Sequence, residues 1–236
     1  MPIDYHKIVI LTGAGISAES GVKTFRASDG LWEGHRVEDV ASPQGFIKNP
    51  NLVYEFYNLR RQQLLSQSVR ENEAHRALAM LEKNFRGEVI TVTQNIDDLH
   101  ERGGSQNVLH MHGELLKARC TQCDKVYECR DDFDQTTICV KCKKTAGLRP
   151  HIVWFGEMPM YMSEITHCLS TCDLFVSIGT SGNVYPAAGF VEIAAHHGAE
   201  TLEINLEPSR VHTQFDRTLY GSATQVVVDW VDELLA

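Results

Sequence analysis

The sequence lacks features that would assign it to a membrane or to nucleic acid. No stretch reaches the roughly 18 apolar residues that a membrane-spanning helix needs, and the polar start, Met1 to Lys7, precedes an apolar run of only a strand's length. Long runs of Lys or Arg are absent, and the formal net charge is −9. We therefore expect a soluble, cytoplasmic protein that binds neither membranes nor nucleic acid. The oligomeric state is open, with a monomer as the first expectation.

Internal repeats, low-complexity tracts and long linkers are also absent. The 236 residues therefore predict one large domain, or a large domain with a small satellite. Hydrophobic residues make up 43% of the chain, which is enough for a substantial core. Seven cysteines, an odd number, fit a reducing cytosol better than a disulfide framework.

Apolar, β-branched runs alternate with helical patterns along the chain. Strands are predicted at Ile8–Leu11, Val89–Thr93, Leu174–Ile178, Thr201–Asn205 and Gln225–Val228. Helices are predicted near Asn51–Leu65, Ala74–Asn84, Ser163–Leu169 and Ala187–His197. Strands that alternate with helices favour parallel pairing. The predicted fold class is therefore α/β, with a Rossmann-like, doubly wound parallel sheet.

Two stretches interrupt this alternation. Residues 22–67 are helical and carry few strand signals, whereas residues 115–148 hold two cysteine pairs. We expect these stretches to form a smaller, inserted part, helical in the first stretch and a zinc ribbon in the second. The larger, Rossmann-like part would comprise residues 1–21, 68–114 and 149–236, so that residues 1–236 form a single catalytic domain.

A glycine-rich turn follows the first predicted strand. Its sequence, Gly13-Ala14-Gly15-Ile16-Ser17-Ala18, has the pattern G-x-G-x-x-A and leads into a short helix that Ser17 could cap. Such glycines let the backbone turn tightly and approach a pyrophosphate at the helix N-terminus, although a purely structural turn is the alternative. No acidic residue closes a second strand about 20 residues later, which argues against an ordinary hydride-transfer enzyme.

The cysteines include two Cys-x-x-Cys pairs, 15 residues apart, at Cys120, Cys123, Cys139 and Cys142. Each pair can present two thiolates to one tetrahedral ion, whereas a redox-active dithiol would need only one pair. Because four cysteines leave no position for water, we predict one structural zinc ion. The remaining thiols are expected to be small core or surface groups: Cys129, Cys168 and Cys172.

Further motifs along essentially the whole chain resemble the sirtuin family. In order, they are Gly13 to Ser17, Phe25-Arg26, Thr93-Gln94-Asn95-Ile96-Asp97, His112-Gly113, the cysteine quartet, Gly179-Thr180-Ser181 and Asn205-Leu206-Glu207. The chain is most similar to small bacterial sirtuins of class III, which are NAD-dependent protein deacylases. It departs from many sirtuins at Val22-Lys23-Thr24, where they have Ile-Pro-Asp, so the conformation of the loop over the cofactor does not follow from the resemblance.

The resemblance implies that NAD is a co-substrate, consumed in each turnover. Asn95 and Asp97 would hold the ribose and the nicotinamide amide, and their place after a strand suits a ligand site, although a polar turn with Asp97 as a helix cap is the alternative. Glu207 could bind a ribose hydroxyl, and Ala223, before the last predicted strand, matches the adenine contact. The NAD contacts implied in this way are Gly13, Ala14, Gly15, Ile16, Ala18, Phe25, Arg26, Trp32, Gln94, Asn95, Ile96, Asp97, Gly179, Thr180, Ser181, Asn205, Leu206, Glu207 and Ala223.

Two histidines flank Met111 and point the same way if the segment is extended. One of them, His110 or His112, could be a buried structural group and the other a base. The resemblance selects His112 as the catalytic base, and an imidazole suits removal of a ribose hydroxyl proton near neutral pH. In the implied reaction the acyl oxygen attacks the anomeric carbon, nicotinamide leaves, and hydrolysis of an alkylimidate releases lysine and an acylated ADP-ribose.

The resemblance also implies an acyl-lysine protein or peptide as substrate. The segment Val153-Trp154-Phe155-Gly156-Glu157 resembles the strand that pairs with the peptide backbone, and a buried strand with aromatic core residues is an equal alternative.

Tyr57 and Arg60 share one face of a predicted helix, which for most such pairs is simply a solvated face. In class III sirtuins a Tyr-x-x-Arg pair binds the distal carboxylate of succinyl-lysine or malonyl-lysine. Ala18 matches the small residue that widens the acyl pocket. Arg61 is expected to point elsewhere, into solvent.

Two other functions stay open at this point. One is mono-ADP-ribosyl transfer, in which a protein side chain captures the same NAD chemistry. The other is a catalytically silent module that senses NAD, although Asn95, Asp97 and His112 are all present.

Overall fold

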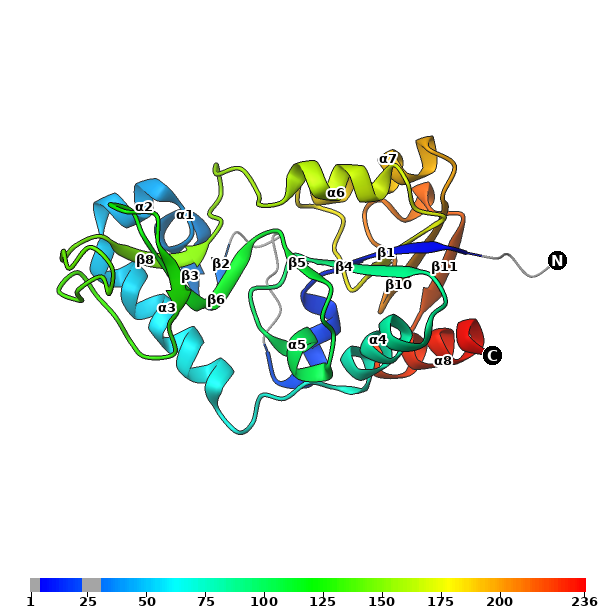
Figure 1. Ribbon diagram of the computed structural model, residues 1–236, viewed down its shortest axis with the longest axis horizontal. Coiled ribbons are helices and arrows are strands. Elements are labelled where there is room, and N and C mark those ends of the chain that lie inside the picture. The colour runs from blue at the N-terminus through cyan, green and yellow to red at the C-terminus, as the bar shows by residue number, and fades with distance from the viewer. Residues whose placement is uncertain (1–4, 23–30) are drawn as a thin grey trace.

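The computed structural model describes residues 5–22 and 31–236 of the chain (Figure 1). Its main sheet has six strands in the order β11-β10-β9-β1-β4-β5, and every neighbouring pair is parallel. Since β4 and β5 lie on one side of β1 and the three later strands on the other, the order reverses between β1 and β9. The predicted α/β, doubly wound fold is therefore confirmed. The strands are β1 (Lys7–Thr12), β4 (Glu88–Thr93), β5 (Val108–His110), β9 (Leu174–Ile178), β10 (Glu200–Asn205) and β11 (Arg217–Tyr220).

Helices cover both faces of this sheet (Figure 1). Successive β1 side chains point to opposite faces, so that Ile8 and Ile10 lie in one hydrophobic cluster and Val9 and Leu11 in the other. The first cluster is completed by α4 (Glu73–Asn84) and α8 (Ala223–Leu235), and the second by α6 (Met162–Leu169) and α7 (Phe190–His196). Shorter elements are η1 (Ala14–Ser20), α5 (Leu99–Gly103), η3 (Ala187–Gly189) and η4 (His212–Gln214).

A smaller part forms one end of the elongated molecule, opposite the C-terminus (Figure 1). It contains an antiparallel sheet in the order β7-β6-β8, against which the long helix α3 packs. The hydroxyl of Tyr54 on α3 donates a 2.6 Å hydrogen bond to the Leu148 carbonyl of β8. The elements of this part are β2 (Leu31–Trp32), β3 (His35–Arg36), α1 (Val37–Val40), α2 (Pro43–Lys48), α3 (Pro50–Leu65), β6 (Gly113–Cys120), β7 (Val126–Glu128) and β8 (Leu148–Ile152).

Two local expectations are wrong. The predicted strand Gln225–Val228 lies inside α8, where Val227, Trp230 and Val231 are buried with helical spacing. The last strand is instead β11, so Ala223 begins a helix rather than preceding a strand. Ser17 lies within η1, which has Gly13 as its N-cap residue and no side-chain cap.

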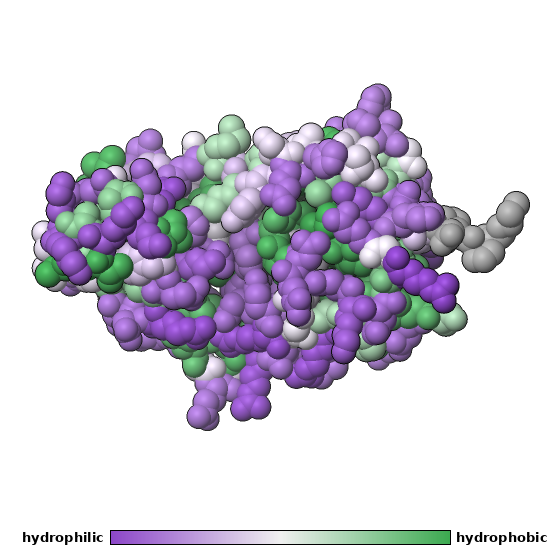
Figure 2. All heavy atoms as spheres, viewed as in Figure 1, coloured by the Kyte–Doolittle hydropathy of each residue, from purple (hydrophilic) through white to green (hydrophobic). Residues whose placement is uncertain are grey.

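The surface of the face seen in Figure 2 is mostly hydrophilic, with hydrophobic residues in separate patches. Among the described residues, no helix combines the length and the apolar character that a membrane crossing requires.

Candidate functional site

Most of the predicted NAD contacts lie where parallel strands end. The carboxyl ends of β1, β4, β9 and β10 share one edge of the sheet, and the reversal between β1 and β9 lies in the middle of it. In open α/β sheets a ligand crevice forms at such a reversal.

The glycine turn after β1 packs directly on the turn after β9. The Gly15 amide donates a 2.9 Å hydrogen bond to the Gly179 carbonyl. A Cβ atom on Gly15 would lie 2.6 Å from the Gly179 Cα atom, so no larger residue fits without a backbone shift. The glycine at position 15 therefore has a packing reason of its own, besides any approach of a phosphate.

Asn95 and Asp97, which follow β4, meet this turn through Ser17. The Asn95 side-chain amide donates to the Gly13 carbonyl and to the Ser17 hydroxyl, both at 3.2 Å. The Ser17 hydroxyl in turn lies 3.2 Å from a carboxylate oxygen of Asp97. All three polar side chains are buried. Sequence reasoning considered Ser17 only as a helix cap and so missed this bridging position.

Asp97 also accepts a 3.1 Å hydrogen bond from the Leu99 amide at the start of α5. Asp97 therefore binds the first amide of α5 beside its contact with Ser17, although the N-cap residue of this helix is Asp98, which makes no side-chain cap. Burial disfavours the charged carboxylate and raises the pKa of Asp97 to about 6, although the hydrogen bonds from Leu99 and Ser17 act in the opposite direction.

His110 and His112 differ in the hydrogen-bond partners of their ring nitrogens. His112 places Nδ1 3.0 Å from the Gln94 carbonyl, which can only accept, so Nδ1 carries the proton and Nε2 keeps its lone pair. Burial lowers the pKa of His112, against the effect of that hydrogen bond, and the neutral form is favoured. Both ring nitrogens of His110 are engaged, by the Asn95 carbonyl and by Glu101. His112 therefore keeps Nε2 without a described hydrogen-bond partner, whereas both nitrogens of His110 have one.

At the ends of β9 and β10, Asn205 donates a 2.7 Å hydrogen bond to the Thr180 carbonyl. The Ser181 carbonyl accepts from the Arg210 amide. Leu206 and Glu207 are exposed beyond the strand. These predicted residues therefore lie next to the reversal, although Glu207 has no described hydrogen-bond partner.

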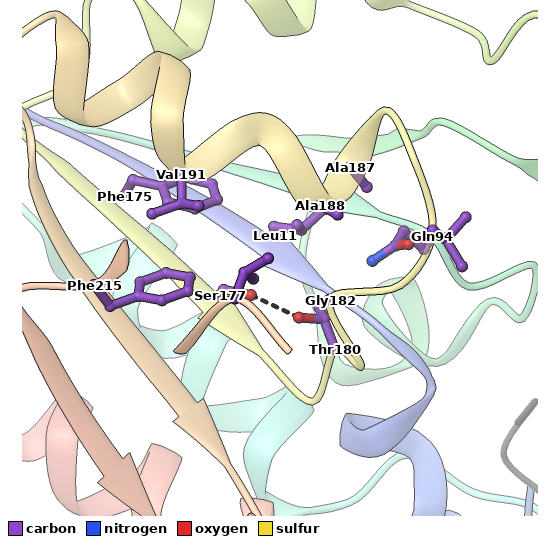
Figure 3. Close-up of a pocket in the computed structure, with 12 residues that line it drawn as sticks. Leu11, Gln94, Phe175, Ser177, Thr180, Gly182, Ala187, Ala188, Val191 and Phe215 are labelled. Carbon is purple, nitrogen blue, oxygen red and sulfur yellow. Dashed lines mark hydrogen bonds between the residues drawn. The ribbon is translucent and has the colours of Figure 1, made fainter. Parts of the chain in front are cut away.

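A pocket opens beside this edge, between the sheet and the chain that leads into α7 (Figure 3). Gln94 and Thr180, two of the predicted NAD contacts, line it, and Thr180 shares a 2.8 Å hydrogen bond with Ser177. The other lining residues are mainly apolar and were not predicted from the sequence: Leu11, Phe175, Gly182, Val184, Ala187, Ala188, Val191, Val211 and Phe215.

The remaining predicted NAD contacts lie in different parts of the molecule and differ in exposure. Ile16 is fully buried in the core, so only its backbone is available to a ligand. Ala18 is exposed on η1, Ala14 and Ile96 are partly exposed, and Ala223 begins α8, which packs against η1. Trp32 packs edge-on against Phe56 and Tyr57 in the smaller part. Phe25 and Arg26 lie outside the described residues.

The segment Val153 to Glu157 is not a strand, because β8 ends at Ile152 and a turn follows. The Val153 amide donates to the His112 carbonyl and the Phe155 amide to the Ala41 carbonyl, at 2.9 and 3.0 Å. Trp154 is buried, whereas Phe155 is 49% exposed. This segment therefore lies beside His112, but its conformation differs from the prediction.

Hydrogen bonds tie this segment to β8 and to α3. The Arg149 guanidinium binds the Glu157 carboxylate through two hydrogen bonds, of 2.6 and 2.9 Å, and lies 3.5 Å from the centre of the Trp154 ring. The Trp154 indole N–H donates to the Tyr57 hydroxyl, which is fully buried. Arg149 carries no local sequence signal, because its role depends on contacts with the turn that follows β8.

The two arginines on α3 differ in their surroundings. Arg60 is partly exposed and its guanidinium lies 5.0 Å from the centre of the Phe56 ring, while its Nε has no hydrogen-bond partner among the described residues. Arg61 was expected in solvent, and this is wrong: it is fully buried, donates to Asn58 and stacks on Phe133. The loop that carries Phe133 folds over α3 and covers Arg61, which no local pattern predicts.

The four paired cysteines come together at the end of the smaller part. Their Sγ atoms all lie within 4.8 Å of one another, and two of the Sγ–Sγ distances are 3.7 and 3.8 Å. Tetrahedral zinc with Zn–S bonds of about 2.3 Å requires sulfur atoms about 3.8 Å apart. The cluster is therefore positioned to bind one zinc ion: Cys120, Cys123, Cys139 and Cys142.

Comparison with known proteins decides the family. Residues 13–186 match the family model described as the Sir2 family, which is more than half of the chain. The chain belongs to the Sir2 family. It is 58% identical over 236 residues to the NAD-dependent protein deacylase of Vibrio cholerae, covering 100% of this chain and 96% of that protein. It is 57% identical over 229 residues to the protein of the same name from Pasteurella multocida, covering 97% and 98%.

Solved Sir2 structures agree with this assignment. A crystal structure of a Sir2 homologue in complex with NAD superposes with a TM-score of 0.89 at 38% identity, covering 99% of this chain and 92% of that one. NAD is thus the co-substrate of the family to which this chain belongs. The sirtuin resemblance and the Sir2 fold with a cysteine cluster suited to zinc are confirmed.

Proposed function

We propose that this Sir2-family protein uses NAD to remove acyl groups from protein lysines, and that it accepts succinyl and malonyl as well as acetyl groups. The products would be nicotinamide, O-acyl-ADP-ribose and free lysine. The names of the relatives from Vibrio cholerae and Pasteurella multocida support the deacylase activity. The side chains on α3 support the wider acyl range.

The observation that carries the catalytic assignment is the hydrogen bond from His112 to the Gln94 carbonyl. It fixes the tautomer in which Nε2 can accept a proton, and burial lowers the pKa of His112 so that the ring is neutral at pH 7. When bound, NAD supplies the electrophilic ribose carbon and the nicotinamide leaving group. His112 then takes a proton from a ribose hydroxyl as general base.

Asn95 and Asp97 are the proposed contacts to the nicotinamide ribose and amide. Both side chains are fixed by Ser17 and the turn after β1, so they need little reorganisation when a ligand binds. Gly13, Gly179, Thr180 and Asn205 would line the remainder of the dinucleotide site at the same sheet edge.

Arg60 and Tyr57 are the proposed acyl-selectivity residues. The buried Nε of Arg60 lacks a described partner, and a carboxylate is the ligand that satisfies a guanidinium best. The Tyr57 oxygen already accepts from the Trp154 indole, which leaves the phenol proton for another acceptor. A distal carboxylate on the acyl chain would meet both groups.

The peptide backbone would run along the segment Val153 to Glu157, between the sheet and the smaller part. The hydrogen bond from the Val153 amide to the His112 carbonyl supports this location, since it fixes the segment beside the proposed base. We further propose that the protein acts as a monomer in the cytoplasm and does not bind nucleic acid, in keeping with its net charge of −9.

The decisive experiment compares Arg60→Met with the wild type on acetyl, succinyl and malonyl versions of one peptide, in the presence of NAD. A buried substrate carboxylate that loses its cationic partner costs about 2–5 kcal/mol of binding free energy. The kcat/KM for the succinyl peptide should therefore fall about 30-fold or more, while the kcat/KM for the acetyl peptide should change little. Arg70→Met, at an exposed arginine beyond the end of α3, is the control and should match the wild type.

Equal losses on the acetyl and succinyl peptides would make Arg60 structural and remove the proposed acyl range. Labelled NAD separates the competing functions: a marked protein acceptor would indicate ADP-ribosyl transfer. Binding of NAD without peptide turnover would indicate a sensing module.

A further inference from the structure

Four successive carbonyl groups, beginning at the last residue of β4, accept hydrogen bonds from one short segment of chain. The Thr93 and Ile96 carbonyls accept hydrogen bonds from the backbone amides of Met111 and Leu115, at 3.1 and 2.8 Å. The two carbonyls between them, of Gln94 and Asn95, accept instead from the Nδ1 atoms of His112 and His110, at 3.0 and 3.3 Å. The backbone of residues 93–96 is thus fixed residue by residue from the segment 110–115.

His110 can occupy this position only as a double donor. Its Nδ1 faces the Asn95 carbonyl and its Nε2 lies 2.7 Å from a Glu101 carboxylate oxygen, and neither oxygen can donate. The ring is 6% exposed, so water does not compete for either nitrogen. Burial alone would lower the pKa of His110, but the hydrogen bond and the charge of Glu101 outweigh burial and raise it.

The partner of this ion pair comes from a different element. Glu101 belongs to α5, and its side chain is 41% exposed. Burial raises the pKa of Glu101, but the hydrogen bond to His110, the charge of His110 and smaller contributions together outweigh burial and lower the pKa, in agreement with a charged pair. His110 therefore joins α5, the end of β5 and the Asn95 backbone at one point.

We propose that His110 is a positioning residue for NAD, which acts by holding the Asn95 carbonyl and thereby orienting the segment 94–97. The inference rests on the proposed role of Asn95 and Asp97 as NAD contacts. The position of the Asn95 backbone determines whether its side chain can reach Gly13 and Ser17. Asp97, two residues later in the same segment, also binds Ser17. A free carbonyl at position 95 would let this turn rotate, and NAD would have to restore the order on binding.

The experiment uses two isosteric variants that each keep one of the two hydrogen bonds. The amide nitrogen of Asn can replace Nδ1, so His110→Asn retains the bond to the Asn95 carbonyl and loses Glu101. The amide nitrogen of Gln can replace Nε2, so His110→Gln retains Glu101 and loses the carbonyl. Both variants remove the charge of the imidazolium and introduce the same amide group, so they are matched in charge and in chemical type.

We expect His110→Gln to raise the KM for NAD about tenfold, with kcat at saturating NAD within about threefold of the wild type. His110→Asn should keep the KM for NAD within about threefold. The two variants should have similar KM values for the acyl peptide. They should also have similar melting temperatures.

Two results would overturn the inference. One is an unchanged KM for NAD in His110→Gln, and the other is an equal loss in both variants together with equal thermal destabilisation, which is what a purely structural histidine would give. A wild-type protein without NAD-dependent turnover would instead refute the proposed function, so the two failures are distinguishable.

Discussion

The indole N–H of Trp154 donates a 3.0 Å hydrogen bond to the hydroxyl oxygen of Tyr57. The Arg149 guanidinium lies over the Trp154 ring, 3.5 Å from its centre, and hydrogen bonds to Glu157 hold it there. Contacts with Arg149 and Glu157 thus hold Trp154 in place, and Trp154 holds the Tyr57 side chain of α3. The proposed peptide segment and the proposed acyl pocket are physically connected at this point.

Trp154→Phe should weaken succinyl selectivity without unfolding the protein. Phe keeps the aromatic packing but removes the donor to Tyr57, so the phenol can turn its own proton toward other acceptors. A lost hydrogen bond of roughly 1 kcal/mol predicts about a fivefold fall in kcat/KM for the succinyl peptide and little change for the acetyl peptide. Trp230→Phe, buried in α8 away from the site, is the control. Parallel losses on both peptides would contradict the prediction.

His112→Ala should fold and retain zinc but lose deacylation about a hundred- to ten-thousand-fold, as expected for loss of a general base. Because burial lowers the pKa of His112 below that of a free imidazole, wild-type kcat/KM should stay constant around neutral pH and fall only when the acid pH passes through this lowered pKa. This acid limb should be missing from the residual activity of the variant. His196→Ala, at an exposed histidine, should behave as the wild type. Near wild-type turnover of His112→Ala would refute the assignment.

One zinc ion per chain should be found by metal analysis of protein purified without chelators. Zinc bound by four thiolates contributes on the order of 10 kcal/mol to folding of such a module, so Cys139→Ser should disorder the sheet β7-β6-β8 and lower activity indirectly. Cys168→Ser, at a buried cysteine of α6, should keep the metal. Wild-type protein that carries no zinc would rule out the site.

Asp97→Asn should stabilise the fold at high pH while it impairs activity. The pKa of Asp97 is about 6 in the folded protein against the ordinary value of 3.8, so the folded state loses roughly 3 kcal/mol of stability relative to the unfolded state as the pH rises through this interval. Asn can accept the hydrogen bond from the Leu99 amide through its Oδ1 atom and can donate from its amide nitrogen to the Ser17 hydroxyl, without a charge. The melting temperature of the variant should exceed that of the wild type at pH 8, and this difference should vanish near pH 4. A constant difference would show that Asp97 does not titrate in this way.

The sheet was predictable where strands are buried on both faces. The segment Leu174–Ile178 is buried at every position, and its continuous apolar run marks it in the sequence. The edge strand β11 is mostly exposed and shows no alternation, so the sequence carries no signal for it. The run Val226-Val227-Val228 reads as a strand in isolation, but its neighbours Trp230 and Val231 complete a helical face that packs on α4.

The sequence predicted which residues lie at the candidate NAD site, but it did not predict the hydrogen bonds between them. The motifs placed Asn95, Asp97 and the glycine turn at strand ends, and parallel pairing brings those ends together. The bridge through Ser17 and the ring contacts of His110 depend on the distance between segments far apart in the chain. Arg61 was misassigned for the same reason, since the loop that buries it begins some 70 residues later.

The proposed chemical and selectivity groups reside on different elements. His112, Asn95 and Asp97 lie at the edge of the parallel sheet, whereas Tyr57 and Arg60 lie on α3 in the smaller part. Substitutions on α3 can therefore alter which acyl group is removed while the catalytic base and its carbonyl anchor stay unchanged. Evolution, or directed mutagenesis, can therefore change substrate preference through α3, an element that carries none of the proposed catalytic residues.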